Sequence, residues 1–213
     1  MKASMQALLQ EAGVWRGVDP SGALAGLRCP TGWSRLDAVL AGAGWPLGTL
    51  IELLLPAHGL GELRLLLPAL RQQLAITPGD SPRWLVWVSP PHEPYPPALA
   101  QSGLDPSRML KIDAAQTQDR LWAVEEVLRS QRAAAVLCWI DRVEDRWLRR
   151  LKLAVAGQGV LLVALRPLAH RARPSPAALR IALQPDDGRL GLELLKERGR
   201  APARVLNVFG TSP

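Results

Sequence analysis

The stretch that decides the fold is residues 49–75, TLIELLLPAHGLGELRLLLPALRQQLA. It opens with an apolar run interrupted only by Glu52, which is typical of a strand in a parallel sheet. A loop with two glycines comes next, and leucines at 63, 66, 67, 70 and 74 then recur with helical spacing. The order of strand, loop and helix predicts a strand at 49–55 and a helix at 61–75, as in one unit of an α/β fold.

The same alternation continues toward the carboxyl terminus. We expect strands at 83–88, 108–112, 134–140 and 159–165, and helices at 117–131 and 144–156. The five prolines between residues 89 and 97 predict a stiff loop without regular structure. The sequence therefore predicts an α/β domain with a mostly parallel sheet and helices on both faces.

The pattern changes after Pro167. Apolar runs at 178–184 and 190–196 flank a turn that contains Asp187-Gly188, a strong signal for an antiparallel hairpin. A last extended run covers 204–209. We expect this C-terminal hairpin to extend the sheet.

Composition indicates one globular domain. The 213 residues suffice for a single buried core, and we assign residues 31–213 to it, preceded by an N-terminal helical segment at 1–30. Cys29 and Cys138 show no metal-ligand spacing, which excludes a disulfide framework and favours a reducing cytoplasm. The apolar runs are too short to span a membrane, and the start lacks the apolar core of a signal peptide.

Positive charge is concentrated in the second half of the chain. Residues 1–106 carry 7 basic and 8 acidic side chains, whereas residues 107–213 carry 19 and 11. Such a basic half favours a polyanionic partner, and the alternative is a GC-rich genome whose codons favour arginine over lysine. Arg166, Arg171 and Arg173 surround a short proline-bearing loop and are candidate contacts to a nucleic-acid backbone. The alternative is a solvated linker between strand and hairpin.

The loop after the first strand, PAHGLGEL, stands where a phosphate-binding loop would stand, but it lacks that loop's chemistry. A working loop ends in Gly-Lys and a hydroxyl residue, which hold the phosphates and Mg²⁺. Here Gly59 and Gly61 remain, while Pro56 replaces the first glycine, Glu62 the lysine and Leu63 the hydroxyl. Because the lysine contributes roughly 3–4 kcal/mol at an effective dielectric of ~20, Glu62 turns attraction into repulsion. We expect no ATP hydrolysis, no cofactor and no metal.

Other residues have predicted structural roles. Trp84, Trp87 and Trp139 lie on expected strands and belong to the core, whereas Trp45 and Trp147 are candidate interface anchors. Asp141 comes directly after a buried strand, where it either caps the next helix or stands in the place of a metal-binding acid. The sequence shows no nucleophile–base set, so catalysis is not expected.

Two upstream motifs bring a family resemblance into view. Residues 31–37, TGWSRLD, and 42–52, GAGWPLGTLIE, resemble the segment that leads into the core of RecA-type recombinases. The chain also resembles the ImuA family nearly end to end, through VWRG at 14–17, the helix and strand at 148–167, and LKERGRAP at 195–202. A narrower resemblance to the division inhibitor SulA spans roughly residues 62–183 and includes LLLPALRQQL and RWLVWV.

The ImuA resemblance implies a RecA-like core without ATPase activity. It would act as an adaptor in damage-induced mutagenesis within the SOS response, with three partners: the inactive Y-family-like protein ImuB, an error-prone C-family polymerase and, as a further candidate, RecA. Weak binding to single-stranded DNA and self-association are candidate properties. The alternative is a SulA-like protein that inhibits FtsZ, the tubulin-like protein of cell division.

The adaptor hypothesis also implies a place for the partner interface. An extended tail can add a strand to a partner or be ordered by it. We expect this interface in the tail, and we expect the core to stay folded without residues 198–213. The candidate interface residues are Arg198, Arg200, Val205, Leu206 and Phe209.

Overall fold

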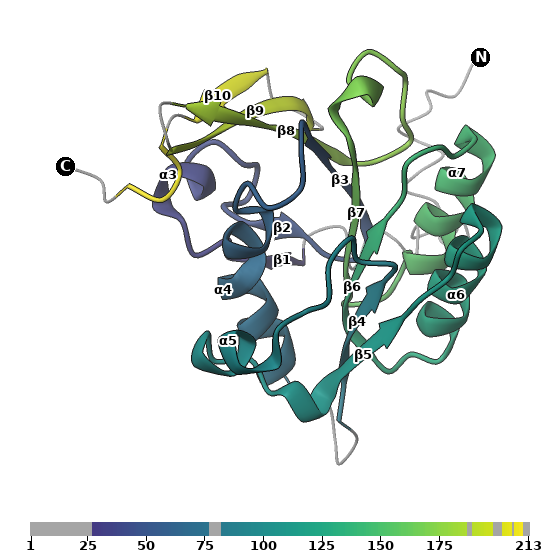
Figure 1. Cartoon of the computed structure of the whole chain (residues 1–213). Coiled ribbons are helices and arrows are strands. Elements are labelled where there is room, and N and C mark those ends of the chain that lie inside the picture. Colours follow the sequence, from purple (N-terminus) through teal and green to yellow (C-terminus); the bar gives the residue numbers. More distant parts are fainter. Residues whose placement is uncertain (1–26, 77–81, 187–188, 198–201, 206, 211–213) are drawn as a thin grey trace, which may run out of the picture.

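A computed structural model describes residues 27–76, 82–186, 189–197, 202–205 and 207–210 (Figure 1). The helices are α3 (Ser34–Asp37), α4 (Glu62–Ala75), α5 (Pro96–Gln101), α6 (Thr117–Arg129) and α7 (Asp145–Val155), with short 3-10 turns η1 (Pro106–Arg108) and η2 (Leu168–His170). The strands of the main sheet are β3 (Thr49–Leu55), β4 (Trp84–Val88), β5 (Met109–Ile112), β6 (Ala133–Trp139), β7 (Leu161–Pro167), β8 (Leu179–Asp186), β9 (Arg189–Glu197) and β10 (Ala203–Val205). A separate pair consists of β1 (Arg28–Cys29) and β2 (Trp45–Pro46).

The main sheet is mostly parallel. Its strand order is β10-β9-β8-β3-β7-β6-β4-β5, and the strands from β8 to β5 all pair in parallel. Only β9 runs against its neighbours, β8 and β10, and so forms the C-terminal antiparallel hairpin. The predicted fold class is therefore confirmed.

Helices cover both faces of this sheet (Figure 1). The α4 face buries one cluster, to which the strands contribute alternate residues such as Leu53, Leu137 and Val163. The face toward α6 and α7 buries a second cluster, which includes Val136 and Leu162. The apolar runs in the sequence arise because both faces of the central strands are covered.

The segment before β3 differs from the prediction. The expected N-terminal helical segment lies outside the described residues up to residue 26, and its last part, at Arg28 and Cys29, is the extended strand β1. This strand pairs with β2, where Trp45 is fully buried. The hypothesis that Trp45 anchors a partner is therefore wrong. The close turn at Gly48, with φ +65°, leaves no room for a side chain, since a Cβ would lie 2.5 Å from the Gln158 carbonyl oxygen.

A buried ion cluster joins three strands of the sheet. Glu52 on β3 is fully buried and accepts hydrogen bonds from Arg166 of β7, at 2.6 Å, and from Arg180 of β8, at 2.7 Å. Arg180 also donates to the carbonyl oxygens of His170 and Arg171, in the segment after β7. Removing one partner from such a cluster leaves an uncompensated buried charge, which is strongly destabilising.

The end of the chain packs on the core. Val205 and Val208 are buried, and the Val208 N–H donates to the Leu190 carbonyl. Phe209 lies edge-on to Trp33, with ring centroids 4.7 Å apart, and the Arg64 guanidinium stacks 4.2 Å from its ring centre. These apolar side chains complete the α4 face, so we expect the core to depend on the tail, contrary to the expectation from the sequence.

Replacing Glu52 by Gln is expected to lower the free energy of unfolding by about 3 kcal/mol or more, because two buried guanidinium groups lose their counter-ion. Urea denaturation followed by circular dichroism measures this. The control is Glu126→Gln, which breaks an exposed pair with Arg129 and should cost no more than about 1 kcal/mol. An equal decrease in the free energy of unfolding in the two variants would contradict a stabilising role of the buried ion cluster.

The double substitution of Val208 and Phe209 by Ala should lower the free energy of unfolding by at least about 2 kcal/mol, because buried apolar area is lost. Arg204→Ala, an exposed position on β10, is the matched control and should change it by less than about 0.5 kcal/mol. If the double variant melts like the wild type, the tail is not part of the core.

Candidate functional site

The candidate functional surface lies where the parallel strands end, which we call the carboxyl edge. It consists of the segments directly after β3, β4, β5 and β6, at residues 56–61, 89–95, 113–116 and 140–144. In α/β sheets this edge is the usual place for ligand sites, because loops from several strands converge there. Three hollows open at or beside it.

The loop after β3 stands where a phosphate-binding loop would stand, and a side-chain carboxylate binds one of its backbone amides. Gly59 and Gly61 adopt positive φ angles of 82° and 102°, and α4 begins directly after Gly61. Glu62 is 4% exposed, and its Oε1 accepts a hydrogen bond from the Gly59 N–H at 2.8 Å. In a working loop, backbone N–H groups hold phosphate. Here the protein's own carboxylate uses one of them.

The neighbouring loop residues contribute no nucleotide chemistry. Leu63 packs against the core of the α4 face, and Pro56 lies exposed at the end of β3. On the other side of the loop, a hollow contains Phe209 and Arg64, so the C-terminal tail lies against the loop. A Cβ on Gly61 would lie 3.3 Å from the Phe209 ring. The prediction that this loop does not bind nucleotide is therefore consistent with its geometry, because Glu62 occupies one loop amide and Phe209 lies beside Gly61.

The first hollow, the edge cleft, has a volume of about 630 Å³. Its polar side chains include His58, Asp113, Arg120 and Asp141. The Arg120 guanidinium donates to three backbone carbonyls at the ends of β5 and β6, which leaves it structurally engaged. Asp141 lies 3.4 Å from His170 and makes no cap to α7, so the helix-cap prediction is wrong.

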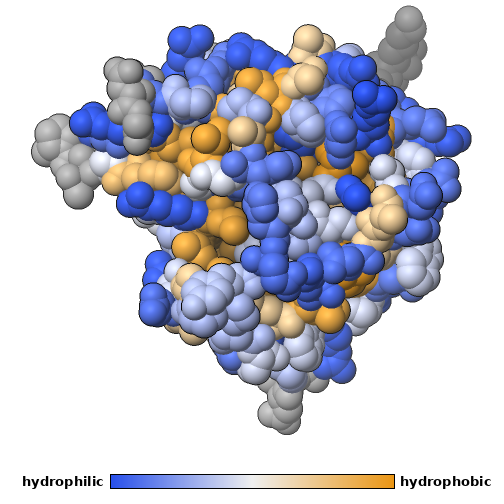
Figure 2. Space-filling view, in the orientation of Figure 1, coloured by the Kyte–Doolittle hydropathy of each residue, from blue (hydrophilic) through white to orange (hydrophobic). Residues whose placement is uncertain are grey.

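The second hollow, the aromatic groove, has a volume of about 340 Å³. It lies between the loop that carries Glu62 and the proline-rich segment that leads into α5. Trp87 and Trp139 stack beneath it, with ring centroids 5.8 Å apart and planes 10° from parallel. Tyr95 lines it and is 68% exposed. Figure 2 shows that, on the face it draws, hydrophobic residues appear as separate patches between hydrophilic ones.

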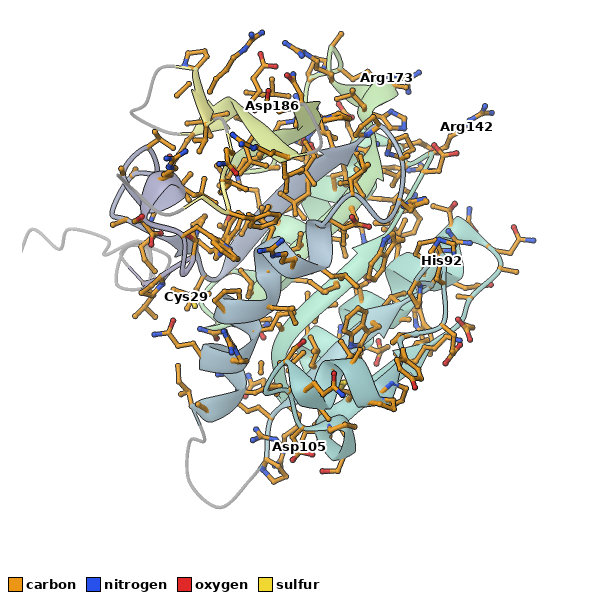
Figure 3. All side chains as sticks on the ribbon, turned by 60° about the vertical axis from the view of Figure 1, so that its left-hand side comes forward. Cys29, His92, Asp105, Arg142, Arg173 and Asp186 are labelled. Atoms are coloured by element: carbon orange, nitrogen blue, oxygen red, sulfur yellow. The ribbon has the colours of Figure 1, made fainter. Side chains whose placement is uncertain are left out.

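The predicted nucleic-acid arginines are not grouped on one exposed loop. Arg166 belongs to β7, its side chain is 4% exposed, and it is held by Glu52, so it cannot contact a nucleic acid. Arg171 is half-exposed but pairs with Glu193 at 2.6 Å. Arg173 projects outward, as does Arg142, at the end of the molecule opposite to Asp105 (Figure 3). The prediction that Arg166 lies on an exposed loop is therefore wrong. Strand β7 extends to Pro167, two residues beyond the end of the predicted strand, and so includes Arg166.

Only two of the five residues predicted as a partner interface in the tail belong to the described part of the chain. Arg198, Arg200 and Leu206 lie outside the described residues. The side chains of Val205 and Phe209 pack against the core, whereas the backbone of β10 forms one edge of the main sheet.

The described residues offer little catalytic chemistry. They contain no group of three histidine, cysteine, aspartate or glutamate side chains able to hold a metal ion. Burial raises the pKa of the Cys138 thiol to about 12 and also raises the pKa of Cys29, so neither thiol is a ready nucleophile at neutral pH. Within the described part of the chain, each helix is too short or too polar to cross a membrane.

With this geometry in place, comparison with known proteins gives the family. A sequence model described as cell division inhibitor SulA matches residues 49–161, just over half of the chain. The chain belongs to the SulA family. The match runs from the start of β3 to the start of β7, and it contains every residue that lines the aromatic groove.

Individual relatives agree with this assignment. Cell division inhibitor SulA of Edwardsiella piscicida is 30% identical over 126 residues, which cover 54% of this chain and 73% of the relative. SulA of Photorhabdus laumondii is 31% identical over 104 residues, and SulA of Pectobacterium carotovorum is 34% identical over 95. The matches cover 49% and 44% of this chain and 56% and 54% of these two relatives, so the chain spans just over half of their length.

These findings correct the adaptor hypothesis. The matching family and the relatives are named for inhibition of cell division, which was only the alternative to the adaptor role. ImuB, a translesion polymerase, RecA and DNA are therefore withdrawn as expected partners. The end-to-end resemblance to ImuA misled because it gave weight to segments outside residues 49–161.

Sequence reasoning missed the aromatic groove. Trp87 and Trp139 were predicted as core, and they are 2% and 5% exposed, but they also form the floor of a hollow. The same prediction for Trp84 is wrong, because this side chain lies at the first position of β4 and is 37% exposed. Tyr95 sits in the proline-rich segment that was expected to lack regular structure, although α5 begins at Pro96. The one available signal was a tyrosine among five prolines in an otherwise tyrosine-free chain.

The loop geometry generates a nucleotide prediction. Millimolar ATP with Mg²⁺ should leave the Tm of the protein unchanged, because Glu62 occupies the Gly59 amide and the loop has no lysine. Binding at one hundred times the Kd would stabilise the fold by about 2.7 kcal/mol, which a thermal shift detects easily. A clear rise in Tm that disappears in Glu62→Ala would overturn this prediction.

Proposed function

We propose that this protein inhibits cell division by binding FtsZ, and that it does so without catalysing a reaction. The observation that carries the proposal is the SulA family match over residues 49–161. This segment includes most of the parallel sheet with α4, α5, α6 and α7, so it is the core of the fold and not a peripheral motif.

The site geometry supports binding over catalysis. A loop filled by Glu62, two thiols with raised pKa values, and the lack of a metal-ligating cluster among the described residues all favour a protein that acts through its surface. A role within the SOS response to DNA damage is part of the proposal. The segments outside residues 49–161, including the C-terminal hairpin, would then support or modify this surface.

Two measurements test the proposal. Overproduction in the native host should make cells filament without septa, and the purified protein should suppress polymerisation of FtsZ measured by light scattering. A non-catalytic inhibitor acts by mass action, so the suppression should saturate at a fixed ratio of protein to FtsZ. An unchanged cell length together with normal polymerisation at a molar excess of the protein would refute it.

The control for specificity is GTP hydrolysis by FtsZ, measured both above and below its polymerisation threshold. A protein that blocks assembly by binding should leave the remaining basal hydrolysis little changed while it removes the assembly-dependent part. A catalytic effect, such as inhibition at ratios far below one to one, would contradict the binding mechanism.

A further inference from the structure

The aromatic groove has rigid walls. Its lining includes Pro90, Pro91 and Pro94, whose rings fix the backbone φ angle, and the stacked pair of Trp87 and Trp139. Rigid aromatic and proline surfaces lose little conformational entropy when they bind, so contact area is converted efficiently into affinity. The groove is therefore prepared for a ligand before the ligand arrives.

Polar atoms in the walls of the groove lack partners. The indole N–H groups of Trp87 and Trp139 and the Oε2 atom of Glu62 are buried, and no described residue hydrogen-bonds them. An unsatisfied buried polar group costs about 1–3 kcal/mol, and native proteins keep few of them. Three of the seven such atoms among the described residues belong to the lining of this one hollow, where a ligand could satisfy them.

The charge of the groove selects the kind of partner. The whole chain carries a net charge of +7, yet neither lysine nor arginine lines the groove. Two carboxylates do, and of these Glu93 is already paired with Lys111, which leaves Glu62. A buried carboxylate oxygen without a partner is complementary to a cationic donor.

We propose that the aromatic groove receives a segment of FtsZ that inserts a large apolar side chain next to a lysine or arginine, with the cation reaching Glu62. This inference rests on the proposed function and names its contact surface. The volume of about 340 Å³ fits one or two side chains, and the whole lining lies in the SulA-matched segment. The exposed ring of Tyr95 would close over the inserted side chain.

The test compares the affinity of purified FtsZ for the full-length protein and three variants by calorimetry. Glu62→Gln removes the charge but keeps an oxygen for the Gly59 N–H, and it should weaken binding by about tenfold and flatten its salt dependence. Ala98→Trp, at an exposed position of α5, fills the groove and should weaken binding by more than about tenfold. Tyr95→Ala should weaken it by about three- to tenfold.

The control is Trp122→Ala, which removes an indole that is 62% exposed on α6 and not part of the groove. Its affinity for FtsZ should equal that of the wild type. A second readout uses 5-fluorotryptophan: FtsZ should shift the ¹⁹F resonances of Trp87 and Trp139, assigned by substitution to Phe, and leave that of Trp122 in place. This signal reports occupancy of the groove directly in the wild-type protein, and only the assignment of its resonances uses the Phe variants.

The outcomes separate the contact surface from the function. If the wild type does not bind FtsZ, both the proposed function and this inference are overturned. If the wild type binds but the groove variants bind equally well and the resonances stay in place, only the groove assignment is wrong. Self-association that is lost in Ala98→Trp, with FtsZ binding unchanged, would identify a second copy of the chain as the occupant and would likewise overturn the inference.

Discussion

Glu52 is the point at which two parts of the sheet are joined. Its carboxylate lies within the SulA-matched segment, whereas Arg166 and Arg180, which donate to it, lie beyond residue 161. One buried negative charge therefore ties β3 to both of its neighbours, and through the carbonyls of His170 and Arg171 it also fixes the segment after β7. Since two guanidinium groups share one carboxylate, this arrangement tolerates neither loss of the acid nor displacement of β8.

The carboxyl edge depends on that alignment. The loop that carries Glu62 begins where β3 ends, and the hairpin and tail that lie against this loop are held by β8. The edge cleft and the aromatic groove thus occupy the side of the molecule where the parallel strands direct their loops toward one another. Their walls are formed by backbone-anchored groups, such as Arg120 and the prolines, so the surface has a fixed shape.

Much of the fold was predictable, because leucine and valine runs separated by helical periodicity leave few alternatives to a covered parallel sheet. What failed depended on tertiary partners. Arg166 precedes a proline in an arginine-rich stretch and suggested an exposed loop, yet β7 extends to Pro167 because buried Glu52 requires a counter-ion. The lone acid in the first strand was the signal for this pairing.

Other failures have the same origin. Val205 and Phe209 resembled an exposed extended edge, but whether such residues face a partner or their own core is decided by the position of β9 and α4. The candidate site was predictable only at the phosphate loop, where a sequence motif exists. The aromatic groove combines residues from β4, α4, α5 and β6, and no local pattern reports such an assembly. The bound carboxylate of Glu62 adds a last consequence: because it is tethered, its effective concentration at the Gly59 amide stays in the millimolar range or above whatever the nucleotide pool. We expect a loop that carries its own anion to be insensitive to nucleotide, so under the proposed function the amount of this protein in the cell, set by synthesis and turnover, would tune its effect.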